Sequence, residues 1–515
     1  MDRESPAKFV VRPKVFALFA AAALAAYGWL IAAHVGACAG GSDSSGYMNH
    51  ARLLAEGHVR MPARVLAGLG PAPMAPYLYS PLGFIPADND PTTLIPTYPP
   101  GLPLLIVAAV PFAGWNHAAD LVLTLHAVAG VLLVFLLGRV FGLPRAWACV
   151  GAAIVAVSPL YLFMSVQAMS DVPALVWTTA AVLAAWVARS RTPWAAAAGA
   201  ALSVAVLIRP TDALALLPVG IALGARPRRW GLLALGAFPA AVFAWMHSRA
   251  AYGHLFATGY GDVSTAFMGA YVMPTLMRYG TWLPVLFTPV CLLFLALPMR
   301  PSVFGRAGAV LFAWAVVYLA FYSAYEFTHE TWWYLRFILP AAPALVIGGL
   351  LVLWRVRLAA PQWVGWPALA FVAWLALLAN GLSWGRTWDV LGAGAGERAY
   401  QTAGQWIATH TAPGAIVGAM QMSGAVSYYT DRTLIRWDML ERGDFARVRE
   451  AALASGRPIY AALFPFEQRE ALTERMPGPW TQVAALRDVT VWRFGPTPSM
   501  GPATRARTGD PASLR

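Results

Sequence analysis

Apolar runs about as long as a membrane helix follow one another through most of this chain, and this repetition constrains the fold more than any other feature. A helix needs about 20 apolar residues to cross the hydrocarbon core of a bilayer. Runs of that kind lie near residues 15–35, 119–141, 146–166, 230–250, 282–298, 306–324, 336–354 and 363–383. Shorter runs lie near residues 172–188, 193–208 and 212–225. The sequence therefore predicts a multi-span α-helical membrane protein with about eleven transmembrane helices.

The composition agrees with this fold class. Of 515 residues, 59% are hydrophobic and 12% are charged, which excludes an ordinary soluble domain. The net charge of +13 could indicate nucleic-acid binding, but the basic residues stand in short loops between the apolar runs, where the positive-inside rule places them. We therefore expect no nucleic-acid partner. Cys38, Cys149 and Cys291 are too widely spaced to indicate a disulfide framework or a metal cluster.

The charges also predict an orientation in the membrane. Basic residues fall in alternate loops, which we assign to the cytoplasm: Lys8, Arg12, Lys14, Arg139, Arg145, Arg189, Arg191, Arg226, Arg228, Arg229, Arg300, Arg306, Arg355 and Arg357. Most acids of the membrane portion fall in the other loops. We predict a multi-pass protein of the plasma (inner) membrane with a cytoplasmic amino terminus. The first run also resembles a signal peptide, but we expect it to be retained as an anchor.

An outer loop and a terminal segment differ from the apolar pattern. The outer loop covers residues 37–118 of the predicted membrane domain, which is residues 1–384, and it ends in an interfacial helix up to residue 112. Residues 385–495 are richer in acids and alternate predicted helices (398–410, 444–455 and 466–475) with β-type runs (415–418, 433–436, 458–463 and 489–494). This alternation predicts a small extracytoplasmic α/β domain. Residues 496–515 are expected to be disordered.

Two outer-face carboxylates are candidates for catalysis. Asp43 follows Gly40-Gly41 just past the first span, and Asp171 precedes Val172-Pro173. Sugar transfer requires a base for the acceptor proton, and a carboxylate at the membrane face can supply one. The alternative for both residues is helix N-capping. A pair of carboxylates could also share a divalent metal ion, so a metal cofactor stays open.

Two arginines lie on the same outer side, against the general polarity. Arg209 and Arg336 could hold the phosphate of a lipid carrier, because a guanidinium binds phosphate oxygens in a bidentate way. Arg209 could instead pair with Asp212. Arg336 could snorkel to the interface or pair with Glu326 or Glu330.

Further outer-face residues could contact substrate. Tyr47 and Tyr98 could stack on a sugar or a polyprenyl chain, although interfacial aromatic belts also explain such residues. His329 and Glu330 could bind substrate or a divalent ion. No His-x-x-x-His or Glu-x-x-His spacing supports a metal, and a solvated pair in a loop is the alternative.

The order of these motifs resembles the GT-C glycosyltransferases, in particular the branch with protein O-mannosyltransferases and bacterial aminoarabinose transferases. The resemblance rests on Asp43 followed by Tyr47, Tyr98-Pro99-Pro100-Gly101, residues 138–142, Ser158-Pro159-Leu160, Ser170-Asp171-Val172-Pro173, Arg209-Pro210 and residues 336–340. It implies an inverting sugar transfer from a polyprenyl-phosphate carrier with Asp43 as general base. Tyr98 stands where a Lys or Glu often flanks the proline pair in that family.

The sequence thus predicts a membrane glycosyltransferase, either hexosyl or pentosyl, that acts on a polyprenyl-phosphate-linked sugar at the outer face. Its acceptor would be a lipid, a glycan or a protein, which the terminal domain would help to bind. The alternative is a transporter or flippase of a lipid or small solute. Transporters usually place ionisable groups or broken helices near mid-membrane, whereas here the polar residues collect at one surface.

Overall fold

The computed structural model describes residues 13–69, 76–88, 90–254, 258–261, 263–361 and 365–495. It divides into two compact units, Met1–Pro62 with Leu82–Gln401 and Ala63–Pro81 with Thr402–Arg515. The division falls after residue 401 rather than residue 384, and Ala63–Pro81 joins the second unit although we had assigned it to the outer loop of the membrane domain. The tail predicted to be disordered lies outside the described residues.

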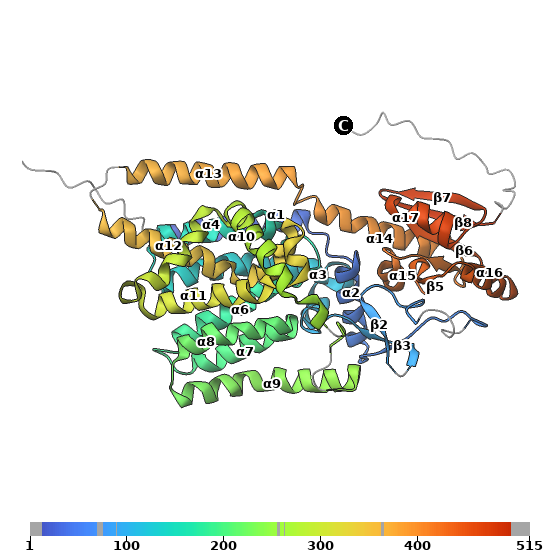
Figure 1. The fold of residues 1–515 in the computed structure, drawn as a ribbon, viewed down its shortest axis with the longest axis horizontal. Coiled ribbons are helices and arrows are strands. Elements are labelled where there is room, and N and C mark those ends of the chain that lie inside the picture. Colours follow the sequence, from blue (N-terminus) through green and yellow to red (C-terminus); the bar gives the residue numbers. More distant parts are fainter. Residues whose placement is uncertain are drawn as a thin grey trace, which may run out of the picture. The chain divides into compact units, whose positions relative to one another are not determined.

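The first unit consists of apolar helices that run alongside one another (Figure 1). Its α-helices are α1 (Pro13–His34), α2 (Ser42–Ala55), α3 (Gly101–Val140), α4 (Arg145–Ala156), α5 (Pro159–Ser165), α6 (Asp171–Val187), α7 (Trp194–Ile208), α8 (Leu216–Leu223), α9 (Pro227–Tyr252), α10 (Val272–Phe287), α11 (Pro301–Ser323), α12 (Ala342–Ala359) and α13 (Trp366–Thr387). Short 3₁₀ helices connect them: η1 (Pro210–Ala215), η2 (Ser264–Ala266), η3 (Gly269–Tyr271), η4 (Pro289–Met299), η5 (Glu326–His329) and η6 (Trp332–Ala341). Large side chains such as Trp314 and Tyr161 are fully buried among them.

Helix lengths support a multi-pass membrane protein. Among the described residues, six helices are long and apolar enough to cross a bilayer, or up to eight if each of two bent pairs forms one span. Three shorter apolar helices cover Asp171–Val187, Trp194–Ile208 and Pro210–Leu223. A total of eleven spans requires these shorter helices to be counted as well, so that number stays a prediction.

Two breaks in these helices have local causes. The long helix α3 is broken at Gly114, where φ is 66°, a backbone conformation that glycine adopts readily. This break separates the segment predicted to be interfacial from the following span. The predicted span at 282–298 is not straight. Helix α10 ends at Phe287, the next residue Thr288 has φ 66°, and η4 begins at Pro289 at an angle of 115° to α10.

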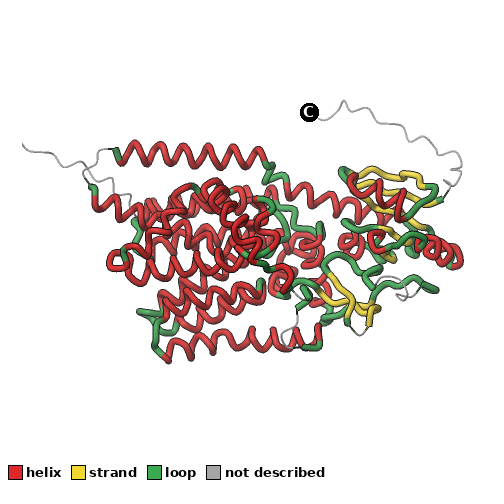
Figure 2. Tube along the Cα trace, viewed as in Figure 1, coloured by secondary structure: helices red, strands yellow, loops and turns green. Residues whose placement is uncertain are grey.

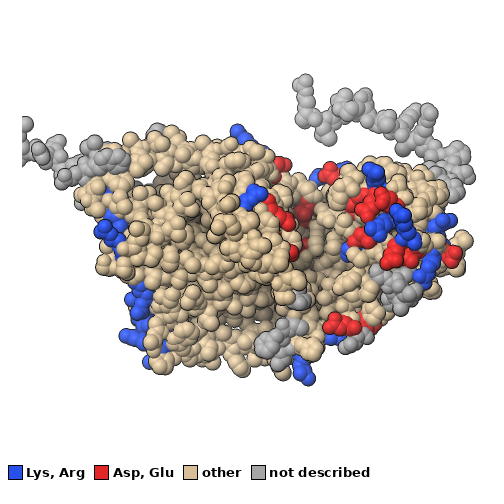
Figure 3. Space-filling model, in the orientation of Figure 1, with Lys and Arg blue, Asp and Glu red and all other residues tan. Residues whose placement is uncertain are grey.

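Many basic residues of the first unit lie at the opposite end of its helices from the candidate acid Asp171. Figure 3 shows a broad uncharged flank over the first unit, with Lys and Arg gathered at one end of its helices. Arg189 follows the carboxyl end of α6, whereas Asp171 is the first residue of that helix. The 17 residues of α6 span about 25 Å, so the two residues mark opposite ends of the helical layer.

The part of the outer loop that belongs to the first unit contains a small antiparallel sheet. Its strands are β1 (Met61–Pro62), β2 (Phe84–Ala87) and β3 (Asp90–Pro96), in the order β1-β3-β2. Helix α2 precedes the sheet in the chain and carries Asp43 in its first turn.

The second unit contains a five-stranded mixed sheet (Figure 2). Its strands β4 (Ile416–Gly418), β5 (Thr433–Ile435), β6 (Ile459–Leu463), β7 (Trp480–Leu486) and β8 (Val489–Phe494) lie in the order β5-β4-β6-β8-β7. Strand β4 is parallel to β5 and β6, whereas β8 is antiparallel to β6 and β7. The accompanying helical elements are α15 (Ser423–Tyr429), η7 (Trp437–Met439), α16 (Asp444–Ala454), α17 (Pro465–Arg469) and the π-helical turn η8 (Glu470–Arg475). Helix α14 (Ala393–His410) runs across the boundary between the two units.

Candidate functional site

Both candidate carboxylates stand at the start of a helix without capping it. Gly41 is the N-cap of α2, and Asp43 lies inside the first turn. Ser170 is the N-cap of α6, and Asp171 is the first helical residue. Neither helix has a side-chain cap hydrogen bond, so the capping interpretation of the two acids is wrong. The positive end of each helix dipole still favours a carboxylate at these positions.

Four charged side chains meet in the first unit and form what we call the charge quartet: Asp43, Asp171, Arg209 and Arg336. Arg336 Nη2 donates to Asp43 Oδ2 at 2.7 Å, and Arg336 Nη1 lies 3.9 Å from Asp171 Oδ2. Arg209 Nη2 lies 3.0 Å from Asp171 Oδ1. The quartet thus alternates in sign, and Asp171 stands between the two arginines.

These pairings differ from the alternatives that the sequence left open. Arg209 forms its ion pair with Asp171 rather than with Asp212, which accepts a hydrogen bond from the Tyr318 hydroxyl at 2.8 Å. Arg336 pairs with Asp43 and Asp171 instead of with Glu326 or Glu330. The two arginines are therefore fixed by the two acids that the sequence had singled out.

Local backbone structure places the two arginines. Arg209 has an extended conformation (φ −143°, ψ 111°) because Pro210 ends helix α7 at this point. Arg336 lies in η6, and its carbonyl is 3.4 Å from Arg209 Nη1. The centre of the Phe337 ring lies 5.4 Å from the Arg209 guanidinium and 5.1 Å from that of Arg336, so one aromatic ring contacts both cations.

Exposure differs across the quartet. The Asp171 side chain is 1% exposed and that of Asp43 is 22% exposed, with Arg209 and Arg336 at 11% and 15%. Burial acts to raise the pKa of Asp43, but the charge of Arg336 and hydrogen bonds from Tyr98 and Arg336 outweigh it and lower the pKa below its usual range. Asp43 is therefore ionised and is the more exposed of the two carboxylates, whereas Asp171 is the interior partner.

Aromatic residues line the approach to Asp43. The Tyr98 ring lies 5.1 Å from that of Tyr47 and 6.0 Å from that of Tyr260, and the Tyr98 hydroxyl is 2.9 Å from Ser42 Oγ. Burial and the neighbouring Asp43 raise the pKa of Tyr98 well above its usual value, so its hydroxyl stays a proton donor. Gly46 permits this packing, since a Cβ there would lie 2.5 Å from the Tyr98 ring.

The proline pair before α3 also contributes to the site. Helix α3 begins at Gly101, where an added Cβ would lie 2.4 Å from the backbone nitrogen of Ile208. The start of α3 therefore packs directly on the last turn of α7, which Arg209 follows. This close approach explains why glycine follows Pro99-Pro100.

His329 and Glu330 lie apart from the quartet's ion pairs. The His329 ring stacks on Tyr271 at 5.0 Å. Across the described residues, no three His, Cys, Asp or Glu side chains gather as a metal-binding group, and the quartet's carboxylates face arginines. The two carboxylates are thus neutralised by arginines rather than free to face a cation, and we derive no step through a metal.

Glu397 is a residue near the site that sequence reasoning missed. It lies in α14, accepts a hydrogen bond from the Gly41 backbone and lies close to the Ser44 side chain, so it lies behind the turn that carries Asp43. Burial raises the pKa of Glu397 to about 7. The only signal in the sequence was the Gly40-Gly41 pair, since the Glu397 carboxylate leaves no room for a Cβ at Gly40.

Comparison with known proteins identifies the fold. No protein-family model and no curated sequence matches the chain, but solved structures do. ArnT from Cupriavidus metallidurans bound to undecaprenyl phosphate matches with a TM-score of 0.56 at 16% identity, covering 94% of this chain and 100% of ArnT. The mycobacterial arabinofuranosyltransferase AftD matches with a TM-score of 0.51 at 14% identity, covering 93% of this chain and 40% of AftD. The protein has the GT-C fold.

A third GT-C structure agrees. The Archaeoglobus fulgidus oligosaccharyltransferase tethered to an acceptor peptide matches with a TM-score of 0.50 at 12% identity, covering 87% of this chain and 69% of that protein. The GT-C fold that the motifs predict is thus confirmed. Within this fold the quartet joins α2, the start of α6, the end of α7 and η6.

Proposed function

We propose that the protein is an integral-membrane glycosyltransferase that moves a sugar, with inversion, from a polyprenyl-phosphate carrier to a lipid, glycan or protein acceptor. The charge quartet carries this proposal: a reachable carboxylate is paired with an arginine in a GT-C fold. The structure of ArnT that shares this fold was determined with undecaprenyl phosphate bound, and this supports a polyprenyl-phosphate donor for the present chain.

The two arginines are suited to bind the carrier phosphate. Their charges are balanced by two carboxylates, so the quartet is neutral before substrate arrives. A phosphate oxygen that reaches Arg336 competes with Asp43 for the same guanidinium. Binding of the donor therefore loosens the Asp43–Arg336 pair and raises the basicity of Asp43 at the moment when a base is needed.

The transfer itself follows from these roles. Asp43 accepts the proton of the acceptor hydroxyl, whose oxygen forms the new bond to the anomeric carbon. The bond between that carbon and the phosphate oxygen breaks, and its electron pair leaves with polyprenyl phosphate. Arg336 and Arg209 stabilise the negative charge that develops on the leaving phosphate.

Asp171 has a positioning role in this scheme. Its side chain is almost fully buried and contacts both guanidiniums, so it cannot reach an acceptor hydroxyl while the pairs persist. It sets the spacing between Arg209 and Arg336 instead. Tyr47, Tyr98 and Tyr260 form an aromatic wall that suits the face of a sugar ring.

The position of the quartet, at the opposite end of α6 from the arginine-rich helix ends, supports a reaction at the outer face of the membrane. Arginine-rich ends indicate the cytoplasmic side, and the quartet lies at the other end of α6. We propose that the donor enters laterally from the outer leaflet of the plasma membrane, with the amino terminus in the cytoplasm.

Mass analysis of surface glycans tests this function. Cells that lack the protein are complemented with wild type, Asp43→Asn or Asp120→Asn. The last variant is a matched control, because Asp120 Oδ1 accepts from the Ala37 backbone and an amide oxygen can do the same. Asp120 Oδ2 also lies 3.2 Å from His117 Nδ1, but that side chain is 74% exposed and such surface pairs contribute little to stability. We expect wild type and Asp120→Asn, but not Asp43→Asn, to restore a sugar whose mass distinguishes hexose from pentose.

The competing transporter hypothesis makes a different prediction. A transporter or flippase would give substrate flux in proteoliposomes without any sugar transfer. Restoration of the surface sugar by folded Asp43→Asn protein, together with such flux, would contradict the transferase proposal.

A further inference from the structure

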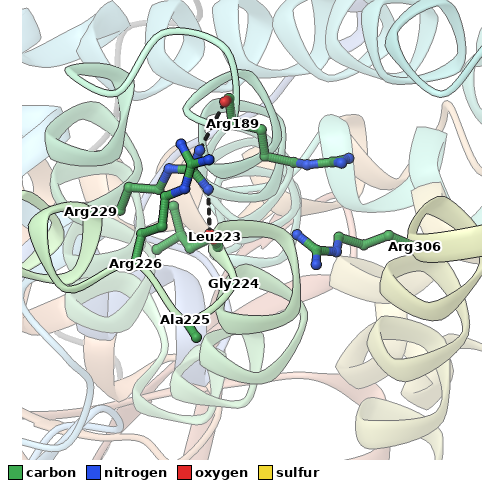
Figure 4. A pocket seen from close by; sticks show the side chains of 7 residues that line it. All are labelled: Arg189, Leu223, Gly224, Ala225, Arg226, Arg229 and Arg306. Carbon is green, nitrogen blue, oxygen red and sulfur yellow. Dashed lines mark hydrogen bonds between the residues drawn. The ribbon is translucent and has the colours of Figure 1, made fainter.

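A second cluster of charge lies at the basic end of the first unit. Arg189, Arg226, Arg229 and Arg306 line a pocket of about 290 Å³ together with residues 223–225 (Figure 4). The lining contains four arginines and no acid. This pocket is separated from the charge quartet by the length of α6 and plays no part in the proposed transfer.

Three helix ends build this arginine pocket. Arg189 follows the end of α6, Arg226 and Arg229 stand at the start of α9, and Arg306 comes from the first turns of α11. Figure 4 shows the Arg306 side chain reaching from α11 toward the loop at Gly224. A Cβ at Gly224 would lie 3.1 Å from Arg306 Nη1, in agreement with this approach.

Arg229 is the buried member of the pocket. Its residue exposure is 4%, and its Nη1 and Nη2 donate to the carbonyls of Leu223 (2.6 Å) and Arg189 (2.8 Å). Its Nε is buried and has no hydrogen-bond partner within the part of the chain that the structure describes. A buried charge with an unsatisfied donor is costly unless an anion or water completes it.

The neighbouring charges add to this cost. Partial burial and then the charge of Arg306 lower the pKa of Arg189. Like charges that surround one cavity repel one another, and an anion inside it would reverse the sign of each interaction. The pocket is therefore electrostatically incomplete without a negative group.

The positive-inside rule explains why arginines occur at this end, but it does not explain their arrangement. That rule requires only basic loop residues in water, as Arg228 illustrates: it is exposed, directly precedes Arg229 and does not line the pocket. A buried arginine with three others around one cavity exceeds this requirement.

We propose that the four arginines form a binding site for a phosphate group. The forked guanidinium matches phosphate oxygens in a bidentate way, and the start of α9 adds the positive end of a helix dipole. The phosphate could belong to an anionic lipid head group or be a free ion. Trp230, 38% exposed, donates its indole N–H to the Gly224 carbonyl at 2.9 Å, and a tryptophan of this kind is typical of the head-group level.

Lipid binding to the full chain in neutral detergent tests this site. Native mass spectrometry measures the affinity for phosphatidylglycerol, and calorimetry measures that for inorganic phosphate. Arg306→Gln removes an exposed guanidinium of the pocket, and Arg228→Gln is the control with the same loss of charge outside it. We expect Arg306→Gln to weaken phosphatidylglycerol binding about tenfold and Arg228→Gln to leave it unchanged.

The two probes distinguish the sources of the phosphate. Inorganic phosphate that binds and competes with the lipid identifies a site for phosphate from either source, whereas binding of lipid alone identifies a head-group site. Arg189→Gln provides a second pocket variant if Arg306→Gln does not fold. An equal loss in the Arg228 control, or no loss in either folded pocket variant, overturns the proposal.

Discussion

Asp171→Asn separates the stability of the charge quartet from its affinity for phosphate. Asp171 is 1% exposed and lies 3.0 Å from Arg209 and 3.9 Å from Arg336. Asparagine keeps the shape of the side chain and remains compatible with the start of α6, but it removes the negative charge between the guanidiniums. The quartet then carries one net positive charge in a largely buried position.

The expected cost follows from this geometry. Removing one partner of a buried ion pair costs about 3–5 kcal/mol, because the remaining charge loses its compensation. At roughly 2 °C per kcal/mol for a large domain, the melting temperature should fall by about 6–10 °C. A carrier phosphate replaces the missing charge, so polyprenyl phosphate should raise the melting temperature of Asp171→Asn more than that of wild type.

Thermal unfolding in detergent, with and without polyprenyl phosphate, measures both effects. Asp120→Asn serves as the control and should melt like wild type in both conditions. The reasoning fails if Asp171→Asn melts at the wild-type temperature, or if the carrier stabilises it no more than it stabilises wild type.

Three further changes probe the surroundings of the quartet. Tyr98→Phe removes a hydrogen bond that lowers the pKa of Asp43, so the acid limb of the pH–rate profile for sugar transfer should move to higher pH, and an unmoved limb would contradict this. Glu397 has a pKa of about 7 against an ordinary 4.5, so the folded state holds a proton that the unfolded state releases. The free energy of unfolding should therefore fall by about 3 kcal/mol as the pH rises from 4.5 to 7. Glu397→Gln should abolish this dependence, so that the melting temperature of the variant no longer falls across this pH range. Gly101→Ala places a Cβ 2.4 Å from the Ile208 nitrogen and should lower both melting temperature and transfer rate, whereas wild-type values for both would refute the packing argument.

The sequence predicted those features of the fold that a single physical rule determines. Apolar run length predicted most helices of the first unit, and the alternation of charge between loops placed Asp43, Asp171, Arg209 and Arg336 on one side. The ion pairs among them could not be predicted, because they join residues up to 293 positions apart. Spacing allows Arg209 to pair with Asp212, but the backbone at Arg209 is extended and its side chain pairs with Asp171 instead.

Long-range packing also explains the other differences. The segment Ala63–Pro81 contains no pattern that assigns it to the second unit, yet the Leu78 carbonyl accepts a hydrogen bond from the Arg436 backbone at 2.7 Å. Strand β7 lacks a regular alternation of apolar and polar residues and is defined by its pairing with β8, which includes an irregularity between Gln482 and Ala484. The sequence does not place Glu397 near Asp43, because the change in composition predicts that residues 385–495 belong wholly to the outer domain.

The release of polyprenyl phosphate from a polyprenyl-phosphate sugar by the purified protein tests the central claim most directly. We predict that wild type releases the carrier in the presence of an acceptor, and that folded Asp43→Asn protein does so at least about a hundredfold more slowly. Carrier release by Asp43→Asn at the wild-type rate would contradict the assignment of Asp43 as the base.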